Sequence, residues 1–365
     1  MEKDLIYRIA LMMTPQIGPV IARALLSHCG SAEEVFNRSV KELSMIPGVG
    51  QIKAAAINKD VMELAEKEIN YAIKHDIRIL SYLCKDYPQR LKFFDTSPVI
   101  LYTKGEISLN PRRTVGIIGT RKPTEFGKIM TEKIVADLKD YDVTIVSGLA
   151  FGVDGIAHRK SIESHIPTIG IMGSGMSHIY PSEHKDLYKK MVTKGGAVMT
   201  EFAHNIGPEK VNFPLRNRII AAMSDALIVV ESKDRGGSII TAEFANEYNK
   251  DVFAIPGKPG EEYSAGCNGL IKKHKAYLME SVKDIAYNMR WEENTKNKAV
   301  QTALFVELDE AERSVYDLLQ QKKGATLDEL CFDLSSTPSS ISTLLLNMEF
   351  KGVVRSLPGK KYIIL

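Results

Sequence analysis

The stretch Val115-Gly-Ile-Ile-Gly-Thr-Arg-Lys-Pro-Thr124 passes from an apolar run through a tight basic turn into a helical pattern. The β-branched residues before Gly119 predict a buried strand, and Pro123-Thr124 predicts the start of a helix. A strand that turns directly into a helix presents main-chain N–H groups and the positive end of the helix dipole. Arg121 adds a guanidinium group that can bind two phosphate oxygens. The turn therefore predicts a phosphate site formed by Gly119, Thr120 and Arg121.

Strand-like and helix-like patterns continue to alternate after this turn. Nearly continuous apolar strands such as Ala226-Leu-Ile-Val-Val230 are typical of a parallel sheet that is covered on both faces. We predict an α/β fold, an extended Rossmann-like parallel sheet domain, whose ligands bind beyond the carboxyl ends of the strands. The expected strands are 114–119, 143–147, 168–172, 197–200, 226–231 and 252–255, and the expected helices are 125–139, 153–164, 183–193, 215–223 and 239–249.

Three further glycine-rich turns follow strands of this pattern, so we expect them at the same edge of the sheet. Their N–H groups and hydroxyls suit phosphate. The second turn, Gly173-Ser174-Gly175, begins a dinucleotide fingerprint but lacks its third glycine, and we expect no nucleotide cofactor. The residues predicted to bind from these turns are Ser147, Gly148, Gly173, Ser174, Gly237 and Ser238.

Cations and one aromatic ring gather in Lys210-Val-Asn-Phe213-Pro-Leu-Arg216-Asn-Arg218, ahead of an expected helix. Single-stranded nucleic acid needs positive charge for its backbone and a ring face for its bases. Lys210, Phe213, Arg216 and Arg218 are therefore candidate DNA-binding residues. The alternative is an ordinary basic helix start with a phenylalanine in the core.

Asp154 and His158 lie four residues apart, at a spacing that a metal ion can use on one helix face. The alternative, which we favour, is structural: Asp154 caps the helix and His158 braces the preceding loop. We predict no metal site and no catalytic residue.

The flanking regions have different patterns. Residues 1–75 are expected to form a helical domain, in which Ile46-Pro47-Gly48-Val49-Gly50 resembles a helix–hairpin–helix turn that can contact DNA phosphates or serve packing alone. The sheet domain is expected over residues 76–290, and a polar linker over 291–307. Residues 308–365 have the winged-helix order of three helices and a hairpin. Its expected recognition helix has no basic residue before Lys351, which favours protein contact or packing over DNA reading.

Composition sets broad limits on function. The chain has 365 residues, a formal net charge of +3 and 44% hydrophobic residues, as expected of a globular protein with a substantial core. Four cysteines that stand far apart, with no C-x-x-C pair, argue against a disulfide framework and fit a reducing compartment. The charged N-terminus does not resemble a signal peptide, and no apolar run reaches membrane-spanning length. We expect a cytoplasmic protein.

These motifs, in this order, resemble the DNA-processing protein A family (DprA, also called Smf). Residues 147–158 match the family signature S-G-x-A-x-G-[IV]-D-x-x-A-H, and Gly119-Thr-Arg121 stands at the family's G-[ST]-R turn. Further matches are Gly173-Ser-Gly175 with Tyr180-Pro181, Phe213-Pro-Leu-Arg-Asn-Arg218, and Gly236-Gly-Ser-Ile-Ile-Thr-Ala242.

The resemblance implies sequence-independent binding of single-stranded DNA by the sheet domain. It also implies homodimerisation and the loading of RecA recombinase onto incoming single strands during DNA uptake (natural transformation), without catalysis. By motif, it places the DNA groove at Arg121, Ser147, Gly148, Gly173, Ser174, Lys210 and Phe213, with Arg216 and Arg218 beside it.

An enzyme is the alternative. Arg235-Gly-Gly-Ser-Ile-Ile-Thr-Ala-Glu243 also looks like a degenerate P-G-G-x-G-T-x-x-E motif of nucleoside-monophosphate phosphoribohydrolases, the lysine-decarboxylase-like family. In that family a glutamate at the Glu243 position acts on the ribosyl bond. Here Arg235 replaces the proline and Ile240 a glycine, so the motif departs where the loop must tighten.

Overall fold

The computed structural model describes residues 3–292, 308–322, 324–357 and 361–364. Contacts divide the chain into two compact units, residues 1–292 and residues 293–365, and each is described by itself. The first unit holds both the predicted helical region and the predicted sheet region, so contacts do not separate the chain at the boundary predicted after residue 75. Most of the predicted linker, residues 293–307, lies outside the described residues.

The N-terminal part of the first unit is helical, as predicted. Gly48 and Gly50, with φ of +83° and +65°, form the turn between two of its helices, because this backbone region is open to glycine. The helical core includes Ile100 and Tyr102 from the sheet region, so the two regions share a packed boundary. The helices are α1 (Lys3–Met13), α2 (Pro19–Cys29), α3 (Ala32–Asn37), α4 (Val40–Ser44), α5 (Gly50–Ala56) and α6 (Met62–Lys74).

One nine-stranded sheet forms the centre of this unit, with strand order β1-β2-β6-β5-β4-β3-β7-β8-β9. The strands from β6 to β9 in this order are parallel, which confirms the predicted sheet. β1 and β2 extend it as an antiparallel edge. The strands are β1 (Arg78–Ser81), β2 (Ile100–Lys104), β3 (Arg113–Ile118), β4 (Val143–Gly148), β5 (Thr168–Ile171), β6 (Gly196–Thr200), β7 (Ala226–Val229), β8 (Asp251–Ala254) and β9 (Tyr277–Leu278).

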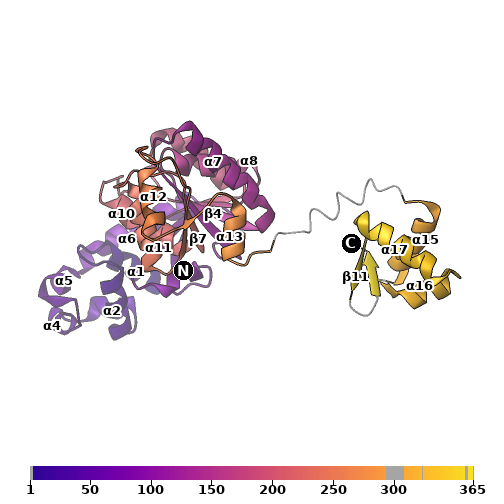
Figure 1. The fold of residues 1–365 in the computed structure, drawn as a ribbon. Coiled ribbons are helices and arrows are strands. Elements are labelled where there is room, and N and C mark those ends of the chain that lie inside the picture. Colours follow the sequence, from indigo (N-terminus) through magenta and orange to yellow (C-terminus); the bar gives the residue numbers. More distant parts are fainter. Residues whose placement is uncertain (1–2, 293–307, 323, 358–360, 365) are drawn as a thin grey trace. The chain divides into compact units, whose positions relative to one another are not determined.

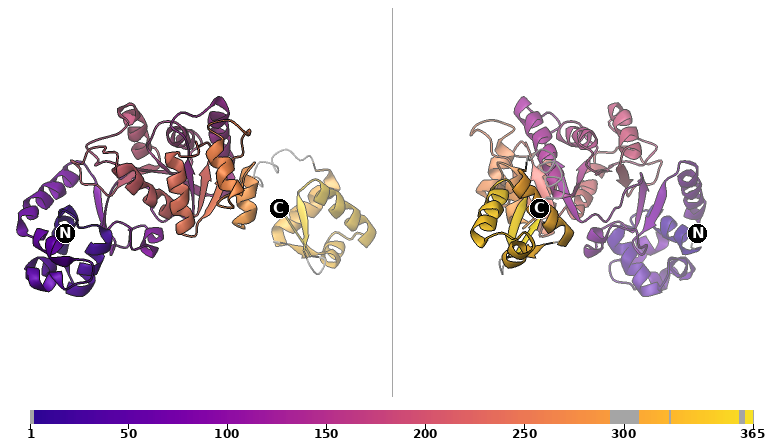
Figure 2. Two further views of the ribbon diagram at one scale, coloured as in Figure 1. Left: turned by 60° about the vertical axis from the view of Figure 1, so that its left-hand side comes forward. Right: turned by 90° about the vertical axis from the view of Figure 1, so that its right-hand side faces the viewer.

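Helices cover both faces of the sheet (Figure 1). α7 (Glu125–Asp137), α8 (Val153–Glu163) and α13 (Val282–Asn288) pack on one face, and α9 (Lys185–Thr193) lies beside α8. α10 (Asn212–Met223), α11 (Gly237–Glu247) and α12 (Ala265–Lys272) pack on the other, and Figure 2 shows the same layers from two further directions. The chain leaves β3 in one direction along the sheet and returns at β7 beside it, so the switch point of the sheet lies between β3 and β7.

The second unit has the predicted winged-helix order. Its three helices are followed by a hairpin, and the three-stranded antiparallel sheet has the order β10-β12-β11. The hairpin turn predicted at Pro358-Gly359 lies outside the described residues. The elements are α15 (Glu310–Lys322), β10 (Ala325–Thr326), α16 (Leu327–Asp333), α17 (Pro338–Phe350), β11 (Val354–Leu357) and β12 (Lys361–Ile364).

None of the helices in the described part of the chain is both long enough and apolar enough to cross a membrane.

Candidate nucleic-acid interface

The four glycine-rich turns lie at the same edge of the sheet, as predicted. Gly119 follows β3, Gly148 ends β4, Gly173 lies just beyond β5 and Gly236 lies beyond β7. These strands are neighbours and run in parallel, so their carboxyl ends meet along one edge. The edge includes the switch point, where sheets of this kind bind their ligands.

The turn after β3 is held by Glu231, which the sequence reasoning did not single out. The main-chain N–H of Thr120 donates to the carbonyl oxygen of Glu231 over 2.8 Å, and the N–H of Thr124 donates to its Oε2 over 2.9 Å. The carboxylate is buried, and a Cβ added at Gly127 would lie 2.2 Å from Oε2. Glu231 thus fixes the backbone on both sides of Arg121, with its main-chain carbonyl at Thr120 and its carboxylate at Thr124. The only signal in the sequence is an acidic residue at the end of an apolar strand.

Arg121 lies exposed above the ring of Phe213, which comes from the start of α10. The guanidinium carbon lies 5.3 Å from the ring centroid, within the range of a cation–π contact. The ring also covers Gly173, where an added Cβ would lie 2.9 Å from Cδ1 of Phe213. Tyr180, 42% exposed, stands with its ring centroid 5.5 Å from that of Phe213. Three segments far apart in the sequence thus form one basic and aromatic cluster.

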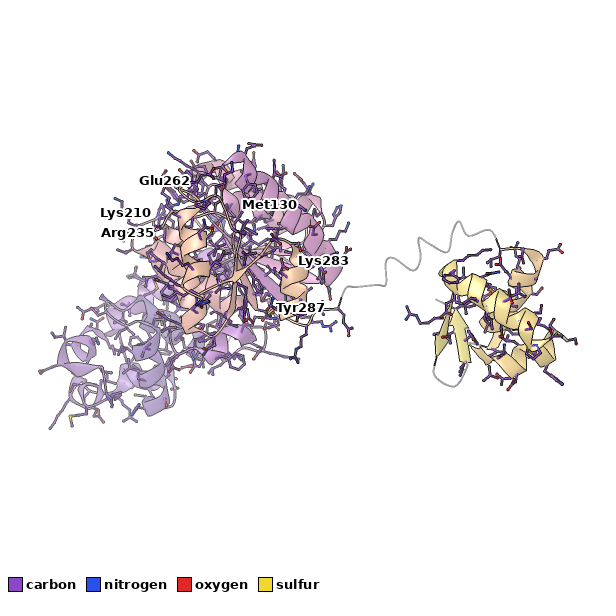
Figure 3. The ribbon with its side chains drawn as sticks, in the orientation of Figure 1. Met130, Lys210, Arg235, Glu262, Lys283 and Tyr287 are labelled. Carbon is purple, nitrogen blue, oxygen red and sulfur yellow. The ribbon has the colours of Figure 1, made fainter. Side chains whose placement is uncertain are left out.

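Lys210 is exposed and lies in the loop between β6 and α10, three residues before Phe213. Arg235 is exposed as well and precedes α11, which packs against α10. In Figure 3 the two side chains project from the same side of the ribbon. The positive charge available to a ligand at this edge comes from such exposed side chains.

Arg216 and Arg218 differ from this group, because both are buried. Arg216 donates from Nη1 to the carbonyl oxygen of Ile171, and burial lowers its pKa to about 10 although Asp154 opposes that shift. Arg218 donates to the carboxylate of Glu201 and, over 2.5 Å, to the carbonyl oxygen of Thr96. Both residues occupy the face of α10 that packs on the protein, so their guanidinium groups do not face solvent. Direct DNA contact by either residue is not supported by this geometry.

The three predicted serines are buried too. Ser147 donates to the carbonyl oxygen of Ile117 over 2.6 Å, Ser174 to that of His178 over 2.6 Å, and Ser238 to the hydroxyl of Ser232 over 2.8 Å. A hydroxyl whose proton is already donated within the protein cannot donate it to a phosphate oxygen. These side chains therefore shape the turns, whereas Gly237 is exposed at the start of α11.

Asp154 and His158 lie beneath the turn after β4. His158 contacts Thr168 Oγ1 at 2.7 Å and the carbonyl oxygen of Gly148 at 3.1 Å, so it braces the loop as favoured above. Burial lowers the pKa of His158 to about 3, and burial raises the pKa of Asp154 to about 6. The cap predicted at Asp154 is wrong, because Gly152 with φ of +76° occupies the N-cap position. No cluster of three potential metal ligands occurs among the described residues.

Glu243, the residue on which the enzyme alternative depends, lies within α11 and is exposed. Its carboxylate is 3.8 Å from the Nζ atom of Lys275. It does not belong to the cluster of Arg121, Gly173, Tyr180 and Phe213.

Three family models match the chain. The model of DNA recombination-mediator protein A matches residues 78–290, that of a SAM-like helix-hairpin-helix tandem residues 9–61, and that of the DprA winged helix domain residues 301–360. The predicted helix–hairpin–helix and winged-helix regions are thereby confirmed.

Relatives and solved structures agree with these models. The DNA processing protein DprA of Bacillus subtilis is 37% identical over 227 residues, which cover 61% of this chain and 76% of the relative. Protein Smf of a Synechocystis species is 33% identical over 272 residues, or 73% of this chain and 68% of the relative. The structure of DprA from Streptococcus pneumoniae matches with a TM-score of 0.63 and 29% identity, over 80% of this chain and 99% of that one. DNA processing protein A from Helicobacter pylori, described for its single-stranded DNA binding mode, matches with a TM-score of 0.53 and 28% identity, over 59% and 95%.

Proposed function

The chain belongs to the DNA recombination-mediator protein A family, and on that basis we propose that it binds single-stranded DNA without sequence preference. The observation that carries the proposal is the cluster at the carboxyl edge of the sheet, where exposed Arg121 stacks on Phe213 above Gly173. Charge for a phosphate and a ring for a base stand side by side there, as single-strand binding requires.

The proposed contacts fall into two groups. Arg121 and Lys210 bind phosphates, and Phe213 and Tyr180 offer ring faces to bases. Exposed Gly237, with half-buried Gly119 and Thr120, lets the strand approach the backbone. Gly148 and Gly173 are buried, Gly148 against Asp154 and Arg216 and Gly173 against the ring of Phe213, so they serve the packing of the turns. Arg216, Arg218 and the three buried serines support the turns from beneath, with partners inside the protein. The contacts with bases are made by ring faces, which every base can meet, so the binding tolerates any sequence.

The first test is a titration of the full chain with single- and double-stranded oligonucleotides across a range of salt. Arg121→Ala and Lys210→Ala should each weaken single-strand binding by about tenfold, because each removes a charge-assisted contact with phosphate. Each should also reduce the slope of log K against log salt by about 0.7. Lys283→Ala is the matched control, because this exposed lysine lies on α13, away from the turns (Figure 3).

The assignment of the edge fails if both variants fold and bind single strands as the parent protein does. A slope that changes equally in the Lys283→Ala control would show that overall charge, rather than this edge, holds the DNA.

We further propose that the chain acts as a homodimer that loads RecA recombinase onto the bound strand, and that it works in the cytoplasm without catalysing a reaction. Support comes from membership of the recombination-mediator family. The test is to follow RecA assembly on a labelled single strand with and without this protein, while light scattering reports its oligomeric state. Binding of DNA without any change in RecA assembly would refute the loading step alone. Release of base from nucleoside monophosphates that depends on Glu243 would instead favour the enzyme.

A further inference from the structure

The loop between β6 and α10, residues 201–211, carries Lys210 to the sheet edge and leads directly into Phe213. Its position is set in part by the helical N-terminal region. His204, in the first half of this loop, meets Glu68 of α6, 136 residues earlier in the chain.

The carboxylate of Glu68 contacts both the main chain and the ring of His204. Its Oε1 and Oε2 atoms lie 2.9 Å and 3.1 Å from the main-chain nitrogen of His204, which donates to them. Oε2 also lies 2.5 Å from Nδ1 of the His204 ring. The glutamate is 1% exposed, so these contacts replace the water that the carboxylate loses on burial. Without them the buried charge would be strongly unfavourable.

A ring stack supports the same contact. The ring of His204 lies parallel to that of Tyr71, with a centroid distance of 4.0 Å and an interplanar angle of 13°. Tyr71 in turn lies 4.2 Å from the ring of His75. Both partners of His204, Glu68 and Tyr71, belong to α6, and His75 directly follows that helix.

Hydrogen bonds and close packing connect this loop to the proposed DNA site. The N–H of Gly175 donates to the carbonyl oxygen of Ile206 over 2.8 Å, and Ser177 donates to that of His204. A Cβ at Gly175 would lie 2.0 Å from the carbonyl oxygen of Ala203, so the two loops are in close contact. Further along, Asn212 bonds back to Glu209 and Gly207. A shift at His204 therefore moves both the turn beside Gly173 and the segment that holds Lys210.

We propose that Glu68 is a positioning residue for the DNA site: by holding His204, it fixes the loop that presents Lys210 and Phe213. The inference rests on the proposed function. It gives the helical N-terminal region a role in single-strand binding that requires no contact between that region and DNA.

The test is a double-mutant cycle in the full chain. Glu68→Ala should weaken single-strand binding by about as much as Lys210→Ala, roughly tenfold. Lys210→Ala should then have little further effect in the Glu68→Ala background, since residues that act through one another are not additive. Arg121→Ala should keep a larger share of its effect there than Lys210→Ala does, because Glu231 holds the backbone of that turn and only the stacking of Arg121 on Phe213 depends on the loop. Glu68→Gln keeps an acceptor for the His204 N–H and should restore part of the affinity, and Glu66→Gln, an exposed change on the same helix, is the control.

A readout without DNA separates this inference from the proposed function. Amide hydrogen exchange in residues 201–211 should be faster in Glu68→Ala than in Glu66→Gln. If the parent protein does not bind single strands, the proposed function is wrong, and faster exchange would still establish the positioning contact. Unchanged exchange, or a full effect of Lys210→Ala in the Glu68→Ala background, overturns the inference. If Glu68→Ala does not fold, His204→Ala in the same cycle decides, with the same outcomes.

Discussion

At the turn after β3 the guanidinium of Arg121 is exposed, whereas within α10 those of Arg216 and Arg218 are buried against the protein. Both segments are basic, both begin a helix at the same edge of the sheet, and both belong to the motifs that suggested DNA binding. In one the cation stacks on a ring and faces solvent. In the other the cations donate to carbonyl and carboxylate oxygens of the protein.

This difference in exposure divides the basic residues of the edge into those that can bind DNA and those that stabilise the protein. An exposed arginine loses little by having no partner in the protein and can exchange water for a phosphate. A buried one has already lost its water and is held by protein acceptors. Moving Arg218 outward would leave Glu201 without its partner, and moving Arg216 outward would do the same to Asp154. We infer that the basic motif of α10 contributes mainly to the stability of the edge and that the exposed cations contribute to affinity.

The largest effect, a loss of unfolding free energy, should come from Arg216→Ala. Its removal leaves Asp154 buried near an empty space, and breaking a buried charge arrangement costs about 3–5 kcal/mol of unfolding free energy. Urea denaturation at pH 7 measures this loss, and Arg121→Ala should lose less than about 0.5 kcal/mol. The loss at Arg216 should shrink as pH falls toward 6, because Arg216 lowers the pKa of Asp154. Without the arginine the Asp154 carboxyl takes up a proton at a higher pH than in the parent protein, which removes the stranded charge.

A stable Arg216→Ala protein with strongly weakened DNA binding would reverse the comparison and restore Arg216 as a direct contact. Arg218→Ala tests the second buried cation in the same way, with Glu201 as the carboxylate left behind.

Local patterns were sufficient for the sheet, its glycine turns and the winged-helix order, because each depends on neighbouring residues. The burial of Arg216 also had a local signal: it lies at helical spacing from Ile219, Ile220 and Met223, all of which are buried. The resemblance of residues 213–218 to the family motif predicted the opposite, namely that Arg216 contacts DNA. By contrast, the contacts of Glu231 with Thr124 and of Glu68 with His204 join residues 107 and 136 positions apart. No periodicity or spacing within one sequence can specify such distant pairs. These pairs nevertheless hold the turn and the loop that carry the candidate binding residues.

A smaller effect on the free energy of unfolding is expected from His158. This residue is buried like Arg216 and Arg218, but its imidazole can become neutral. Its pKa falls from an ordinary 6.5 to about 3 on burial, so the native state keeps it neutral while the unfolded chain binds a proton. Stability therefore falls as pH decreases below 6.5, by up to about 1.4 kcal/mol per pH unit. Asp154 acts in the opposite direction between pH 3.8 and about 6, because its native pKa is raised.

His158→Gln isolates the histidine, because Asp154 is common to both proteins. The difference in unfolding free energy between parent and variant should shrink as pH falls from 7 to 5. His28→Gln, a change at an exposed histidine, should leave the pH profile of the parent protein unaltered. Parallel profiles for His158→Gln and the parent would show that His158 is not held neutral in the folded protein.

The smallest effect concerns two exposed cations of the turn after β7. Lys233 pairs with Glu262 over 2.6 Å, and its ammonium also lies 5.0 Å from the ring centroid of Tyr263. Arg235 comes from the same turn and projects from the same side of the ribbon as Lys210 (Figure 3). An exposed ion pair contributes little to stability, so a phosphate can displace Glu262 from Lys233 at small cost. Arg235→Ala should therefore weaken single-strand binding about two- to threefold and lower the salt slope by about 0.7, with Lys233→Ala weaker still. Oligonucleotide titrations across salt measure both. Glu262→Gln should raise the contribution of Lys233 to binding. A loss from Lys233→Ala that equals or exceeds the loss from Arg235→Ala would mean that pairing with a carboxylate of the protein does not decide which exposed cations hold the strand.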